Sequence, residues 1–198
     1  MKKREERLQI SETPTKTTSA LPGHLYACHS GAATEALCYV NGTEDVTGPD
    51  YEFYYNYTYD GAMDYPGAIS NIMSIKDQDG NQEQMPVFWR IIMNWASNAH
   101  TILLPPGPVD VATMFSINNY TRELYIGGTR DDRHWNDTKP SEGRPHNLSM
   151  FHLCYQWAGD YWYHSLAWVT GVKGTKPQNP SCTPVTISIA APADGKGK

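Results

Sequence analysis

Several features that would place a protein in a class at once are absent from this chain. Charged residues make up only 19% of its 198 residues, the net charge is −5, and no basic face is concentrated anywhere, which argues against nucleic acid as a partner. No apolar run approaches the about 20 residues that cross a membrane. The G-x-S-x-G, H-E-x-x-H, P-loop and Rossmann glycine signatures are all missing as well. The sequence therefore excludes the enzyme classes that these motifs mark.

Metal-ligand spacing is also missing. The seven histidines are dispersed, and no two lie at ligand spacing on one element, so we expect neither a metal nor a cofactor. The four cysteines (Cys28, Cys38, Cys154 and Cys182) show no C-x-x-C spacing, which favours two disulfides over a zinc site. Three pairings are open, and Cys28–Cys38 with Cys154–Cys182 is the most local one.

The disulfides and the glycosylation motifs together predict the secretory pathway or the extracellular space as the location. Five N-x-S/T sequons begin at Asn41, Asn56, Asn119, Asn136 and Asn147. The first twenty residues are polar and lack the apolar centre of a signal peptide. We expect them to be a disordered N-terminal extension of a chain from which a signal peptide has been removed.

What the chain does contain is typical of strands and turns. It has 13 tyrosines, 16 glycines and 14 prolines, and no convincing amphipathic helix. The pattern predicts one all-β domain over residues 21–190, either a β-sandwich or a jelly-roll-like barrel of about ten strands, followed by a tail over 191–198. Besides a hairpin over Phe151–Trp168, the expected strands are His24–His29, Ala36–Val40, Tyr51–Tyr59, Ala68–Ile75, Val87–Trp95, His100–Leu104, Val111–Ile117, Arg122–Ile126 and Thr183–Ala190.

The hairpin over residues 151–168 has the highest density of aromatic residues and is the expected centre of the fold. A turn near Gly159 would pair residues whose numbers sum to about 318, placing His152 near Leu166 and diagonal to His164. Either histidine is a candidate general acid or base, and the alternative is a structural, hydrogen-bonded role. The aromatic candidates for ligand contact in this hairpin, with core packing as the alternative, are Tyr155, Trp157 and Trp168.

Two further groups are candidates for chemistry. Arg90 lies in an apolar stretch between Trp89 and Trp95, and it could clamp an acidic ligand while the two indoles contact its ring. The alternatives are a salt-bridged arginine and two core tryptophans. Asp131 and His134 could transfer protons within a charged loop, or that loop is simply solvated.

Three segments carry a resemblance to known families: WRIIMNWASNAHTILLPPG, ELYIGGTRDD and LCYQWAGDYWYHSLAWVTGVKGTKPQNPSC. The last is similar to the C-terminal signature of a family of small secreted-type fungal β-proteins. There, a cysteine in an aromatic strand accompanies a second one after a KPQNPSC-type loop, which supports the Cys154–Cys182 pairing. The chain also resembles, more distantly, the fungal hetero-Diels–Alderases of tropolone sesquiterpenoid biosynthesis, although no catalytic motif carries that second resemblance.

Two functions follow as hypotheses. The first is a cofactor-independent pocket enzyme, a pericyclase that dehydrates a hydroxymethyl tropolone to a quinone methide and joins it to a terpene alkene by (hetero-)Diels–Alder cycloaddition. The alternative is a secreted, non-catalytic β-sandwich that binds a carbohydrate or another ligand. A closed aromatic pocket would favour the enzyme, and exposed aromatics would favour the binding protein. The expected partner is a hydrophobic or aromatic small molecule, and a homodimer is a candidate assembly.

Overall fold

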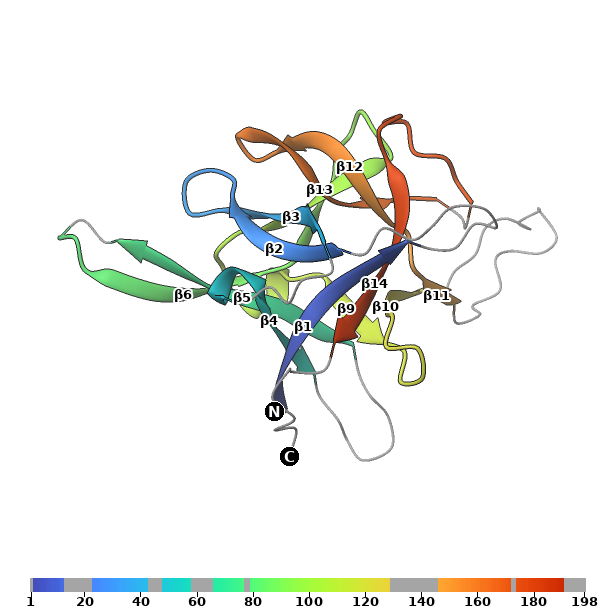
Figure 1. Ribbon diagram of the computed structural model, residues 1–198. Coiled ribbons are helices and arrows are strands. Elements are labelled where there is room, and N and C mark those ends of the chain that lie inside the picture. The colour runs from blue at the N-terminus through green and yellow to red at the C-terminus, as the bar shows by residue number, and fades with distance from the viewer. Residues whose placement is uncertain are drawn as a thin grey trace.

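The computed structural model shows an all-β protein in which two curled antiparallel sheets pack as a sandwich (Figure 1). It describes residues 2–12, 23–42, 48–57, 66–76, 79–128, 146–171 and 174–190, with the backbone alone for 2–12, 57, 146 and 190. Its first seven strands are β1 (Lys2–Glu12), β2 (Gly23–His29), β3 (Glu35–Asn41), β4 (Glu52–Tyr57), β5 (Gly67–Lys76), β6 (Gln82–Phe88) and β7 (Arg90–Ile92). The others are β8 (Ala99–Leu104), β9 (Met114–Ile117), β10 (Leu124–Gly128), β11 (His146–Leu148), β12 (Phe151–Ala158), β13 (Tyr161–Val169) and β14 (Thr183–Ala190). Two short 3-10 helices are η1 (Pro49–Tyr51) and η2 (Val109–Val111).

The described strands form one hydrogen-bonded path that folds over on itself. Its order is β11-β10-β9-β5-β4-β1-β14-β12-β13-β3-β8-β7, with β2 on β1 and β3, and β6 on β5. Curling brings the two halves of this path face to face and lets each bury one surface. The predicted fold class is confirmed.

Aromatic side chains fill the space between the sheets. The Trp89 ring meets Phe53 and Phe115 edge-on, at centroid distances of 5.5 and 5.8 Å. Phe115 stacks on Phe151 at 6.0 Å, and Phe151 meets Trp168 edge-on at 5.1 Å. Edge-to-face contacts at these distances are the favourable arrangement for aromatic rings. This line of five rings therefore occupies the interior with the protein's own side chains.

Both predicted disulfides are present. Cys28–Cys38 ties β2 to β3, and Cys154–Cys182 ties β12 to the segment just before β14. Two disulfides fit an oxidising compartment such as the secretory pathway or the extracellular space.

Four regions differ from the sequence prediction. Residues 2–12 form β1, which pairs with β14, β2 and β4, where a disordered extension was expected. A polar strand can be held by backbone pairing to its neighbours, which composition does not reveal. The predicted strand over 87–95 is split into the end of β6 and β7, and its last residues form a turn. The segments of β6 and β11 were expected to lie mainly in loops.

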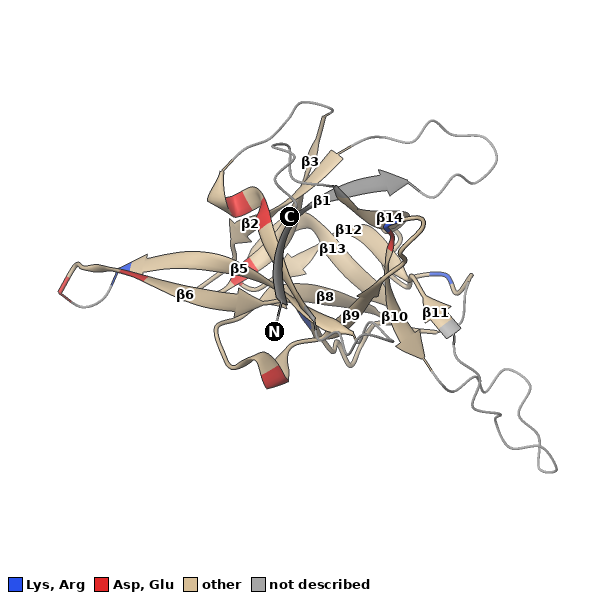
Figure 2. Cartoon of the chain, turned by 90° about the horizontal axis from the view of Figure 1, so that it is seen from below, with Lys and Arg blue, Asp and Glu red and all other residues tan. Residues whose placement is uncertain are grey.

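Outside β1, which is rich in lysine, arginine and glutamate, charged residues are sparse on the described strands, and several lie at strand ends and connections (Figure 2). In the described parts of the chain, no helix has the length and apolarity needed to cross a membrane.

Candidate functional site

The β12–β13 hairpin is built around a turn that only glycine fits. Gly159 has φ +64°, a left-handed conformation, and a Cβ there would lie 1.8 Å from the carbonyl oxygen of Ser30. The Asp160 amide donates to that same oxygen at 2.9 Å, and the Ser30 hydroxyl donates to the Ala158 carbonyl. The loop between β2 and β3 therefore holds the tip of the hairpin in place.

Four side chains near this tip form an exposed group, which we call the aromatic surface: Tyr155, Trp157, Trp162 and His164. The register pairs Tyr155 with His164 and Trp157 with Trp162, so all four lie on one face of the hairpin. Tyr155 stacks on Trp162 with ring centroids 5.6 Å apart and lies 5.0 Å from the His164 ring. Trp157 meets Trp162 edge-on at 5.7 Å. The rings are thus in mutual contact and form a continuous patch.

The aromatic surface is open to solvent. Tyr155 is 47% exposed, Trp157 53% and Trp162 57%. The same face of the hairpin runs inward through the Leu153–Leu166 pair to Phe151 and Trp168, which are buried in the core. One face of one hairpin therefore passes from the packed interior to a solvent-exposed patch of rings.

The other face of the hairpin and its flank hold the patch rigid. Gln156 is buried there, and its side-chain amide donates to the Ser165 hydroxyl at 3.1 Å. On the flank, the Tyr155 carbonyl accepts from the Ser181 hydroxyl and from the Asn179 amide, both at 3.1 Å. The Cys154–Cys182 disulfide anchors that flanking segment to β12. A preorganised surface loses little conformational entropy when a ligand binds.

A second feature is an acidic side chain at the start of β3. The Glu35 carboxyl is partly buried, and its Oε2 atom has no hydrogen-bond partner in the described part of the chain. Burial, and then the neighbouring Asp50 carboxylate in η1, raise the pKa of Glu35 to about 7. Glu35 can therefore hold a proton near neutral pH.

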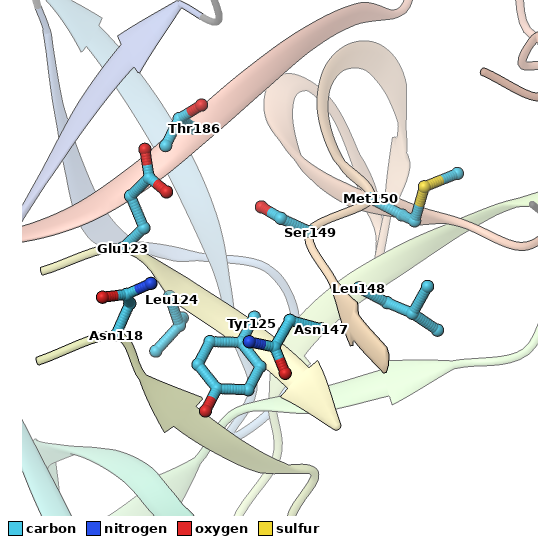
Figure 3. A pocket seen from close by; sticks show the side chains of 9 residues that line it. All are labelled: Asn118, Glu123, Leu124, Tyr125, Asn147, Leu148, Ser149, Met150 and Thr186. Carbon is cyan, nitrogen blue, oxygen red and sulfur yellow. The ribbon is translucent and has the colours of Figure 1, made fainter. Parts of the chain in front are cut away.

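A third feature is a cleft of about 280 Å³ between β10, β11, the segment after β11, and β14. Glu123, Tyr125, Asn147 and Thr186 contribute polar groups to it, and Leu124, Leu148 and Met150 contribute apolar walls (Figure 3). The volume is at the small end of the range for sites that enclose an organic ligand.

The structure brings three of the predicted site residues together and separates the others. Tyr155, Trp157 and His164 share the aromatic surface, whereas Trp89 and Trp168 belong to the core. Arg90 is exposed at the start of β7, and Trp95 lies 94% exposed in the turn that follows. Trp89 and Trp95 therefore do not share a strand face. Asp131 and His134, together with the sequon at Asn136, lie outside the described residues.

The prediction that His152 and His164 lie close together was wrong, because the predicted pairing of the two arms is shifted by one residue. The arms pair with Phe151 opposite Trp168, so His152 faces Ala167 and lies on the opposite face from His164. His152 is buried, and its Nδ1 hydrogen donates to the Met150 carbonyl at 3.1 Å. Desolvation lowers the pKa of His152 despite this bond. Its position is that of a neutral structural histidine.

Sequence reasoning missed Trp162 and Glu35. Trp162 was not among the candidates for ligand contact, although the true register places it directly opposite Trp157. No pattern in the sequence distinguishes Glu35 from a surface glutamate, because its burial and its proximity to Asp50 both arise only in the folded chain.

No cluster of three or more histidine, cysteine, aspartate or glutamate side chains suited to a metal ion occurs within the described ranges. Among known proteins, no family model matches this chain, and neither does any curated protein or solved structure. The function therefore has to be argued from the site itself.

Proposed function

We propose that this protein binds a carbohydrate on the aromatic surface of the β12–β13 hairpin. The observation that carries the proposal is the exposure of three large rings, between 47 and 57% each, in mutual contact on a rigid strand pair. Contiguous exposed apolar patches on a protein surface mark interaction or ligand-binding sites. A sugar ring presents an apolar C–H face that packs on indole and phenol rings.

The polar groups around the rings favour a saccharide over a purely apolar ligand. The Tyr155 hydroxyl, the indole N–H groups and the His164 ring bring donors and acceptors to the same patch. Sugar hydroxyls at the rim of a stacked ring can bond to such groups. The patch is also open, which allows an extended polysaccharide to pass across it.

His164 supports a second candidate, the dehydrating hetero-Diels–Alderase. A flat tropolone could stack between the terpene partner and the Tyr155–Trp162 pair, with His164 as the only titratable group of the patch besides tyrosine. In that reaction His164 would give a proton to the hydroxymethyl oxygen, which departs as water, and the ring hydroxyl would lose its proton, so that a neutral quinone methide forms. The quinone methide would then add across the alkene without a cofactor. The openness of the patch favours the first candidate.

Secretion and homodimer formation are further proposals. Sedimentation velocity would test for the homodimer.

Binding can be tested with two matched tryptophan variants. Trp162→Ala removes the ring at the centre of the patch, whereas Trp95→Ala removes a ring that is 94% exposed in a separate turn. In calorimetric titrations with soluble oligosaccharides of plant and fungal cell walls, we expect the first variant to weaken binding about tenfold and the second to leave it unchanged. Equal effects of the two substitutions, or no binding by the intact protein, would contradict the proposal.

The same protein separates the two candidates. Incubation with a hydroxymethyl tropolone and a humulene-type alkene should give product no faster than the uncatalysed rate if the patch binds sugars only. Stereoselective product that is lost in His164→Ala, while oligosaccharides fail to bind, would instead establish the cycloaddition activity.

A further inference from the structure

A sequon lies inside the cleft between β10 and β11. Asn147, Leu148 and Ser149 all line it, and together they form an N-x-S acceptor sequence. The Asn147 side chain is exposed at the edge strand β11 and lies beside the Tyr125 ring (Figure 3). A sugar attached to Asn147 would therefore begin its path in this cleft.

The strand opposite Asn147 leaves space for such a sugar. The register pairs Asn147 with Gly127, and a Cβ on Gly127 would meet no heavy atom of the described residues within 4 Å. Tyr125 precedes Gly127 by two residues on β10, so its ring projects from the same face of the sheet. The glycine thus forms an open floor and the tyrosine a wall beside it.

We propose that Asn147 carries an N-linked glycan whose first sugar lies over Gly127 and packs against Tyr125, filling the cleft. The host's transferase would form the bond between Nδ2 and the anomeric carbon of a lipid-pyrophosphate-linked oligosaccharide. The lipid pyrophosphate leaves, and the amide nitrogen loses one proton. The cleft is then the seat of the protein's own glycan, and no free ligand occupies it.

Asn56 provides a contrast within the same chain. It is half-buried in β4, and its Nδ2 donates to the Ser70 hydroxyl at 3.3 Å. A glycan on that nitrogen would replace one of its two hydrogens and lie against the neighbouring strand that carries Ser70. Occupancy at Asn147 does not face these obstacles.

The test uses the full chain secreted from a eukaryotic host. Peptide mass spectrometry should show Asn147 occupied. Enzymatic trimming to a single N-acetylglucosamine should leave the Tm unchanged, whereas complete removal should lower it by about 3 °C, because one ring-packing contact is lost. Complete removal converts the asparagine to aspartate, so an Asn147→Asp variant provides the matched reference.

Two variants identify the contact. In Tyr125→Ala, removing the last sugar should no longer change the Tm, whereas Tyr125→Phe should retain the full difference. Asn41→Gln, which removes a sequon on β3, should leave the Tm effect at Asn147 intact. An unoccupied Asn147, a Tm that does not respond to removal of the last sugar, or a full response in Tyr125→Ala would each overturn the proposal.

Discussion

Replacing Glu35 with glutamine should remove a pH-dependent destabilisation of the fold. Glu35 is the first residue of β3 and pairs with the buried Leu104. Its Oε2 atom has no hydrogen-bond partner in the described part of the chain. Burial and the nearby Asp50 carboxylate raise the pKa of Glu35 from 4.5 to about 7. Ionising this group in the folded protein is therefore unfavourable. Glutamine keeps the shape of the side chain and cannot ionise.

The sign of the effect follows from the two protonation states. Well below pH 4.5 Glu35 is protonated whether the chain is folded or unfolded, so it adds no pH dependence. Between pH 4.5 and about 7 the unfolded chain loses this proton while the folded protein keeps it, so stability falls as the pH rises. Well above pH 7 Glu35 is ionised in both states, so the destabilisation that it causes no longer changes with pH. A shift of this size in a fully buried group would correspond to about 3 kcal/mol, and solvent screening of a partly exposed carboxyl reduces our expectation to about 1 kcal/mol.

Urea unfolding at a series of pH values from 4 to about 8.5, bracketing both pKa values, measures this effect. The free energies of unfolding of the wild type and Glu35→Gln should coincide at the acid end and diverge through the window, with the variant more stable by about 1 kcal/mol at the alkaline end. Glu83→Gln, at an exposed position of β6, is the matched control and should track the wild type throughout. Parallel wild-type and Glu35→Gln curves over the whole range would refute the reasoning.

Three other predictions concern the turn of the β12–β13 hairpin and the two disulfides. Gly159→Ala should destabilise the protein by more than about 2 kcal/mol, because its Cβ would lie 1.8 Å from the Ser30 carbonyl oxygen at φ +64°; a loss below about 0.5 kcal/mol in urea unfolding would show that the turn is not constrained as described. Replacing Cys154 and Cys182 together with serine should cost about 3.5 kcal/mol, because the disulfide closes a segment of 28 residues in the unfolded chain. The corresponding loss for Cys28 and Cys38, separated by 10 residues, should be about 2.7 kcal/mol, and the reverse order would contradict the loop-closure argument.

Local patterns predicted most of the strands because they depend on residues that are neighbours in sequence. Alternation placed β4, β5, β8 and β12–β13 close to their true bounds, and the segment over Thr183–Ala190 matches β14. β1 was missed because its pairing with three other strands is a property of the folded sheet. The break after β6 was missed for a similar reason. There the Trp89 amide donates to Ile69 and the Trp89 carbonyl accepts from Thr113, so the chain leaves the strand to place an indole in the core.

The candidate site was only partly predictable because it depends on register. A shift of one residue in the pairing of β12 with β13 exchanges the two faces of one arm. The predicted register therefore placed His152 on the same face as His164, and it did not place Trp162 in the patch. The disulfide pairing was accessible because both bridges are local in sequence. The raised pKa of Glu35 was not predictable, because it depends first on burial and then on the Asp50 carboxylate of η1, and both arise only in the folded chain.

The distribution of aromatic residues along one hairpin face supports a binding role for the exposed part. Phe151 and Trp168 are explained by the core, since their burial contributes to stability. Beyond the Leu153–Leu166 pair the same face is open, and rings there contribute far less to folding than buried ones. Polar side chains would serve the fold equally well at these positions and would carry less risk of aggregation. Three rings in contact at the solvent-exposed end of the hairpin therefore support the proposal that a ligand covers them.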